Sequence, residues 1–140
     1  MQKTTIIGNL GNDPEMRFTP NGESVTSFSV AVNRRWTGRD GQQNQETVWF
    51  RVSAWGKQAE NCEKYLHKGK QVYVEGRLIF DRSTGGPRLW TAQDNTVRAS
   101  FELHAAHVQF LAGGEPGARN GGNYQGQEGD SSINEDDIPF

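Results

Sequence analysis

Residues 47–55 read TVWFRVSAW, and this stretch decides the fold. Every second position in it is apolar; these positions are Val48, Phe50, Val52 and Ala54. Side chains of a strand point alternately to opposite faces, so the pattern predicts a strand with one face in a core. The other face carries the indoles of Trp49 and Trp55 on either side of the Arg51 guanidinium. Exposed rings with a cation between them indicate a ligand that offers flat faces and negative charge, such as single-stranded nucleic acid.

The same strand allows a second interpretation. In a sandwich or a closed barrel, Trp49 and Trp55 would simply pack under another sheet or against a subunit, because tryptophan is commonly largely buried. The strand alone does not decide between packing and ligand binding. The sequence features in the rest of the chain are needed to decide.

Length and composition favour one compact domain together with a disordered part. The chain has 140 residues, 17 glycines and 33% hydrophobic residues, and its mean hydropathy is −0.81. No run of residues is apolar enough to span a membrane, and the first ten residues lack the apolar core of a secretory signal. The lone Cys62 fits a reducing compartment, so we expect a cytoplasmic protein without a membrane partner.

Charge is distributed unevenly along the chain. The net charge is −2, but residues 1–111 hold 14 Lys and Arg against 11 Asp and Glu, whereas residues 112–140 hold one Arg against six acids. The first part therefore carries +3 and the second −5. This asymmetry is typical of a weakly basic binding domain with an acidic tail.

Alternation and turn residues predict an all-β fold with one helix. Strands are expected at 3–10, 25–33, 47–55, 71–80 and 98–111, and a helix is expected at 57–68, ended by Gly69. Residues 15–18 are expected to resume the first strand, and Val72, Val74, Leu78 and Phe80 to share one face of the fourth. Gly76 interrupts that strand where a bulge or bend fits. This order matches an OB-fold five-stranded barrel.

Residues 34–45 (RRWTGRDGQQNQ) are polar and lack periodicity, so we expect a flexible hairpin loop. It presents Arg34, Arg35, Trp36 and Arg39. Basic side chains interleaved with an aromatic ring suit a loop that follows a nucleic-acid strand, and a solvated loop with an incidental tryptophan is the alternative.

Nothing in the sequence indicates catalysis. No acid, base or nucleophile group has convincing spacing, so an enzyme is not expected, and neither is a cofactor. Cys62, His67, His104 and His107 are the residues from which a zinc site would have to be built. Because Cys62 shares the core stripe of the helix with Ala59 and Leu66, and the histidines lack paired cysteines, we predict no metal site.

The chain resembles the bacterial single-stranded DNA-binding proteins over almost its whole length. The blocks that carry the resemblance are IIGNLGNDPEMRFTPNGESVTSFSVAVNRRW (6–36), TVWFRVSAWGKQAENCEKYLHKGKQVYVEGRL (47–78) and the final DDIPF (136–140). The resemblance implies an OB barrel, a homotetramer, and sequence-independent binding and protection of single-stranded DNA during replication, recombination and repair. The resemblance also implies that the protein is cytoplasmic and associated with the nucleoid.

The resemblance also assigns individual residues. Base stacking falls to the four tryptophans, Trp36, Trp49, Trp55 and Trp90. Phosphate contacts fall to the basic residues of the matching blocks, Arg17, Arg34, Arg35, Arg51, Lys57 and Arg77. Trp55 stands where many members have Phe, and Phe50 stands where some have His at a subunit contact. The stretch DRSTGGPR (81–88) resembles an insertion just before Trp90.

The C-terminal part divides into two predicted segments. Residues 1–111 form the expected DNA-binding and oligomerisation domain, and 112–133 form a Gly-rich flexible linker. Residues 134–140 form an acidic tip that ends in Asp136, Asp137, Ile138, Pro139 and Phe140. An apolar end beside acids suits a basic-rimmed apolar pocket, and the family's tip docks replication and repair enzymes; the alternative is a solubility tail.

Two other classes of protein make different predictions. An OB-fold adaptor similar to primosomal replication proteins would lack the full aromatic set and the acidic tip, and this chain has both. A small nuclease would need clustered carboxylates and a divalent metal.

Overall fold

The computed structural model describes residues 1–112 of the chain. The predicted linker, apart from residue 112, and the predicted acidic tip lie outside the described residues. The described elements, in chain order, are β1 (Thr4–Leu10), β2 (Glu15–Phe18), β3 (Ser24–Thr37), β4 (Gln43–Trp55), α1 (Lys57–Tyr65), β5 (Gln71–Ile79), β6 (Arg88–Thr91) and β7 (Val97–Phe110).

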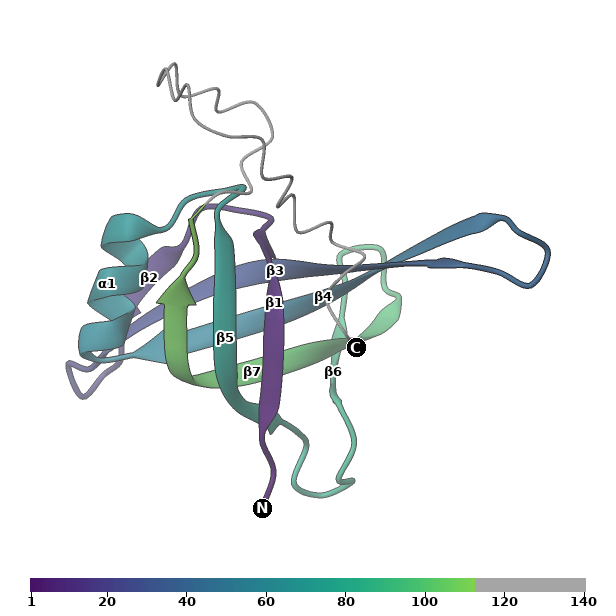
Figure 1. Ribbon diagram of the computed structural model, residues 1–140. Helices are drawn as coiled ribbons and strands as arrows, with labels where there is room; N and C mark the ends of the chain where they lie inside the picture. Colours follow the sequence, from purple (N-terminus) through teal and green to yellow (C-terminus); the bar gives the residue numbers. More distant parts are fainter. Residues whose placement is uncertain (113–140) are drawn as a thin grey trace, which may run out of the picture.

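Five of these strands close into a barrel (Figure 1). Their order is β1-β5-β7-β4-β3, and pairing of β1 with β3 closes the ring. β4 and β7 run parallel, while the other neighbours in the ring are antiparallel. α1 connects β4 to β5. This is the architecture of an OB fold, and the predicted fold class is confirmed.

The barrel interior follows the predicted alternation. Val52 and Ala54 of β4 are fully buried, and Phe28 and Leu103 reach the same core from β3 and β7. α1 covers one end of the barrel (Figure 1), where its Cys62 is fully buried. Burying each large apolar side chain contributes roughly 1.5–3 kcal/mol, so this alternation provides much of the driving force for folding.

The predicted loop at 34–45 is wrong. β3 and β4 remain paired without interruption up to Thr37 opposite Gln43, and only residues 38–42 form the turn. The result is a long two-stranded ribbon, which we call the arm, extending from the barrel end opposite α1 (Figure 1). Backbone hydrogen bonds build the arm whatever its side chains are, and both of its faces are exposed, so no hydrophobic alternation marked it in the sequence.

Three further expectations need correction. Residues 15–18 do not resume the first strand but form β2, which pairs with β3. The helix ends at Tyr65, not near residue 68, because Leu66 adopts extended backbone that places its side chain in the core. Phe80 does not share the core face with Val72, because β5 ends at Ile79 and the Phe80 side chain is left exposed.

The predicted irregularity at Gly76 is confirmed. Glu75 pairs with His107 and Gly76 pairs with Ala105, so Ala106 of β7 is the extra residue of a bulge. The bulge reverses the faces of β7: Leu103 and Ala105 face the core before it, and Val108 packs against the core after it. No helix in the described residues is both long and apolar enough to cross a membrane.

Candidate nucleic-acid interface

The side of β4 that faces away from the core forms the centre of the candidate site. We call this surface the outer face; on β4 it consists of Trp49, Arg51, Ser53 and Trp55. The strand register extends it sideways, because Ser29 lies opposite Arg51 on β3 and Ser27 lies opposite Ser53. Because serine side chains are short, the surface between the two indoles is recessed relative to the rings. At about 3.3 Å per residue, the indoles stand roughly 20 Å apart along the strand.

A groove with a volume of about 330 Å³ lies at the Trp55 end of the outer face. We call it the basic groove. Arginines from three strands line it, Arg17 of β2, Arg51 of β4 and Arg88 of β6, together with the half-buried Trp55 and His104. Among residues 1–112, Glu102 is the only acid that lines it, and Glu102 pairs with Arg88 at 3.3 Å. The groove therefore has a positive excess beside an aromatic plane, which suits a nucleotide.

A second hollow of about 470 Å³ contains Trp49, whose indole is 53% exposed. Arg51 lines this hollow as well as the basic groove, so the two hollows adjoin at that residue. The sequence prediction that Trp49, Arg51 and Trp55 form one aromatic and cationic surface agrees with this geometry.

Trp36 lies on the arm, apart from the other tryptophans. Its side chain is 39% exposed, and the Arg34 guanidinium lies over its ring at 5.0 Å. Arg34 also pairs with Glu46 across the arm at 3.4 Å. Trp36 and Arg34 continue the β3 positions that face the core in the barrel, so they lie on the opposite side of the ribbon from Arg35. The arm thus presents basic groups on both of its sides.

Trp90 lies on β6, opposite Arg98 of β7. Its ring is 46% exposed, its Nε1–H donates to the Ser100 hydroxyl at 2.7 Å, and the Arg98 guanidinium lies 5.9 Å from the ring centroid. Trp90 and Arg88 are two residues apart, so their side chains lie on the same face of β6. Because Arg88 lines the basic groove, this face of β6 is on the same side of the protein as the outer face. The insertion at 81–88 has not removed Trp90 from this side of the protein.

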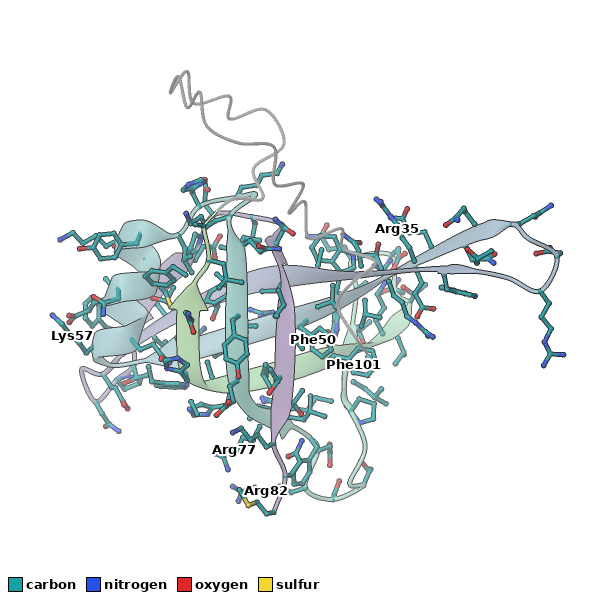
Figure 2. The ribbon with its side chains drawn as sticks, viewed as in Figure 1. Arg35, Phe50, Lys57, Arg77, Arg82 and Phe101 are labelled. Atoms are coloured by element: carbon teal, nitrogen blue, oxygen red, sulfur yellow. The ribbon has the colours of Figure 1, made fainter. Side chains whose placement is uncertain are left out.

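Two predicted phosphate-binding residues do not line these hollows. Lys57 begins α1 at the end of the protein opposite the arm that carries Arg35 (Figure 2), and it pairs with Glu60 at 3.5 Å. Arg77 lies near the connection from β5 to β6 (Figure 2) and lines a separate hollow with the N-terminal residues. Arg17 and Arg51 line one groove, and neither Lys57 nor Arg77 lines it.

Two residues that line the basic groove, Arg88 and His104, are not among the predicted DNA-binding residues. In the sequence, His104 is a candidate only for a metal site, and Arg88 lies at the end of the predicted insertion. They reach the groove because β7 pairs with β4 in parallel, which puts His104 opposite Ser53. No local sequence pattern predicts a contact between residues so far apart in the chain.

Cys62 and the histidines do not come together. Within residues 1–112, no three His, Cys, Asp or Glu residues are placed to hold a metal ion. Cys62 is fully buried, and burial raises the pKa of its thiol to about 12. A buried, protonated thiol of this kind is an inert packing group.

Comparison with known sequences gives consistent matches. The model of the single-strand binding protein family matches residues 1–111. Single-stranded DNA-binding protein 1 of Chlorobaculum tepidum is 35% identical over an alignment of 158 residues, which covers all of this chain and 98% of that protein. A single-stranded DNA-binding protein of Neisseria meningitidis is 37% identical over 113 residues, 81% of this chain and 61% of that protein. These names agree with the prediction of a binding protein rather than an enzyme.

Solved structures share the fold. A deletion mutant of the single-stranded DNA-binding protein from Thermus aquaticus superposes with a TM-score of 0.63 at 28% identity, over 81% of this chain and 51% of that one. A Plasmodium falciparum SSB in complex with single-stranded DNA gives a TM-score of 0.63 at 27% identity, over 79% of this chain and 95% of that one.

Proposed function

The chain belongs to the single-strand binding protein family, and on that basis we propose that it binds and protects single-stranded DNA without reading its sequence. The observation that carries the proposal is the run of Trp49, Arg51 and Trp55 on one face, where Arg51 lines both of the adjoining hollows. Indoles stack on any base because every base has a flat face, and guanidinium groups neutralise phosphates whatever the sequence.

Base stacking is assigned to Trp49 and Trp55 on the outer face, to Trp90 on β6 and to Trp36 on the arm. Phosphate contacts are assigned first to Arg17 and Arg51, which share the basic groove. The other predicted phosphate contacts extend the path beyond the groove, and they are Arg34, Arg35, Lys57 and Arg77.

Titration with oligo-dT and with duplex DNA of equal length, at two salt concentrations, tests this function. The readout is intrinsic tryptophan fluorescence. We expect quenching by the single strand alone, weakening as salt rises, because stacking quenches indoles and phosphate neutralisation releases counterions. A folded protein whose fluorescence does not respond to oligo-dT contradicts the proposal and favours an adaptor that acts through protein contacts.

We further propose that the protein is a homotetramer. Phe50 and Phe101 lie in ring contact at 5.7 Å, and Phe101 is 57% exposed in the single chain (Figure 2). Exposed apolar surface of this kind favours association with other copies. Sedimentation equilibrium is expected to give four times the chain mass of 15.6 kDa. A monomer at micromolar concentration would rule the tetramer out.

The cellular role proposed here is protection of single strands during replication, recombination and repair, in the cytoplasm at the nucleoid. The acidic tip, which ends in Asp136, Asp137, Ile138, Pro139 and Phe140, recruits partner enzymes. Removing Asp136 to Phe140 should leave oligo-dT affinity unchanged and abolish binding of purified replication and repair enzymes. Unchanged enzyme binding by the shortened chain would refute the role of the tip.

A further inference from the structure

Trp55 and His104 lie face to face in the basic groove. Their ring centroids are 5.6 Å apart and their planes are inclined by 25°. Trp55 ends β4 and His104 lies on β7, and the parallel register that pairs Ser53 with His104 sets the imidazole beside the indole. Offset stacking of two such rings is a favourable geometry.

The stack is the directional contact that orients this indole. Nε1 of Trp55 is buried and has no hydrogen-bond partner within the described part of the chain. Trp90 differs, because its Nε1 is fixed by the Ser100 hydroxyl. A ring without a hydrogen bond is oriented by the groups packed against its faces and edges, and His104 is one of these groups for Trp55.

The backbone of His104 is itself closely confined. Arg77 of β5 pairs with His104, and at the neighbouring Gly76 an added Cβ would overlap the His104 carbonyl group. Gly76 therefore lets β5 approach β7 at this point more closely than any other residue would. A barrel strand, and not a surface loop, holds the backbone of His104, so the Trp55 ring packs against a residue whose position is fixed.

We propose that His104 is a positioning residue for single-stranded DNA binding: its imidazole stacks on one face of Trp55 and presents the rest of the indole to a base in the groove. The proposal rests on the function proposed above and adds a residue to it. Arg17, Arg51 and Arg88 surround the same groove and place cations where the adjoining phosphates lie. His104 thus stacks on the Trp55 indole and lines the same groove as these three arginines.

A histidine in this place also makes binding depend on pH. The charged groups around it are the cations Arg17, Arg51, Arg77 and Arg88 and the acids Glu23 and Glu102. Lys3 and Glu75 line the neighbouring hollow with His104 and pair with each other at 2.8 Å. Burial and the charge of Arg77 lower the pKa of His104 from 6.5, and Glu23 opposes them.

His104 therefore gains its proton in a more acidic range than an ordinary histidine does. Phosphates in the groove favour the imidazolium, so binding of DNA takes up a proton in that range. By linkage, affinity for single-stranded DNA rises as the pH is lowered.

Two substitutions separate the stacking role from the charge. His104→Ala removes both, whereas His104→Phe keeps a flat ring and removes the charge. His67→Phe is the matched control, because His67 follows α1 and does not line the groove. The affinity of each full-length variant for rhodamine-labelled oligo-dT is measured by anisotropy at pH 8 and at about pH 5.5. Circular dichroism checks that each variant is folded.

At pH 8 we expect His104→Ala to bind roughly twofold to tenfold more weakly, as loss of an aromatic pair predicts, and His104→Phe to bind like the wild type. Between pH 8 and about pH 5.5 the wild type and His67→Phe should gain roughly twofold to fivefold in affinity, and His104→Phe should gain clearly less. Thymine does not titrate in this range, so the ligand itself contributes no change.

Folded His104→Ala that matches the wild type at both pH values would overturn the positioning role, as would His104→Phe that binds as weakly as His104→Ala at pH 8. An equal gain at low pH in His104→Phe would overturn the protonation. If the wild type does not bind oligo-dT at either pH, the proposed function itself is wrong, and the role of His104 falls with it.

Discussion

The indole of Trp49 lies directly against the backbone of Gly11, so closely that a Cβ on Gly11 would overlap Cζ3 and Cη2 of the ring. The Gly11 amide is fixed by donation to the Ser29 carbonyl at 3.0 Å. Because the backbone is held and the ring is half exposed, a methyl group at Gly11 would move the indole rather than the strand. Gly11 therefore sets the position of the central stacking ring.

Gly11→Ala is accordingly expected to weaken binding of oligo-dT while leaving the fold stable. The loss should be smaller than that of Trp49→Ala, because the ring is displaced and not removed. Titration by tryptophan fluorescence and a thermal melt measure the two effects. A variant with unchanged affinity would show that Trp49 binds DNA from more than one position.

Trp49→Ala should reduce affinity for oligo-dT by about 1–3 kcal/mol, the value of one stacked base. The matched control is Tyr65→Ala, since Tyr65 is 54% exposed but lies on α1, away from the outer face. Fluorescence anisotropy with labelled oligo-dT measures both variants. Equal affinities of a folded Trp49→Ala and the wild type would remove Trp49 from the site.

Arg51→Gln should change the salt dependence of binding as well as the affinity. Each phosphate neutralised on a single strand contributes about 0.7 to the slope of log Kobs against log salt, so the slope should fall by roughly that amount. Arg82→Gln is the control, because Arg82 lies in the loop before β6 and does not line the basic groove (Figure 2). An identical slope in Arg51→Gln and the wild type contradicts a phosphate contact.

Gly76→Ala should destabilise the barrel. Its Cβ would collide with the His104 carbonyl, which is backbone and has little freedom to move, and such overpacking costs about 1–3 kcal/mol. Gly86→Ala is the control, because a Cβ there meets only the Thr84 hydroxyl at an ordinary 3.6 Å. The free energy of unfolding in urea measures both variants. Equal stabilities would mean that β5 and β7 move apart without cost.

Acid should weaken the fold through Glu75. The Lys3 ammonium and the Tyr73 hydroxyl hydrogen-bond to this carboxylate, and these two bonds lower its pKa from 4.5. A carboxyl whose folded pKa is depressed adds stability above pH 4.5 and loses it as the pH falls through the folded value. Urea unfolding at pH 7 and about pH 3.5 should therefore show a smaller loss for Glu75→Gln than for the wild type. An equal loss assigns the acid sensitivity to other carboxylates.

The sequence by itself determined the features that depend on neighbours along the chain. Alternation at 47–55 identified the core face of β4 and the opposite face that carries Trp49 and Trp55, because side-chain direction in a strand has a period of two. Helical spacing of Ala59 and Cys62 identified the buried side of α1, and Leu66, the third residue of the predicted stripe, is buried just after the helix ends. The family and the fold class followed from such local blocks, and the comparisons agree with them.

Only the tertiary structure decided the features that depend on register between distant strands. The arm has no hydrophobic pattern, since its ladder is made by backbone groups that every sequence possesses. His104 stacks on Trp55, and Arg88 joins Arg17 and Arg51, because β7 lies beside β4 in one particular register. The sequence alone identified Trp55 as a candidate stacking residue. It did not indicate the contact of Trp55 with His104, because that contact joins strands whose residues are about fifty positions apart in the chain.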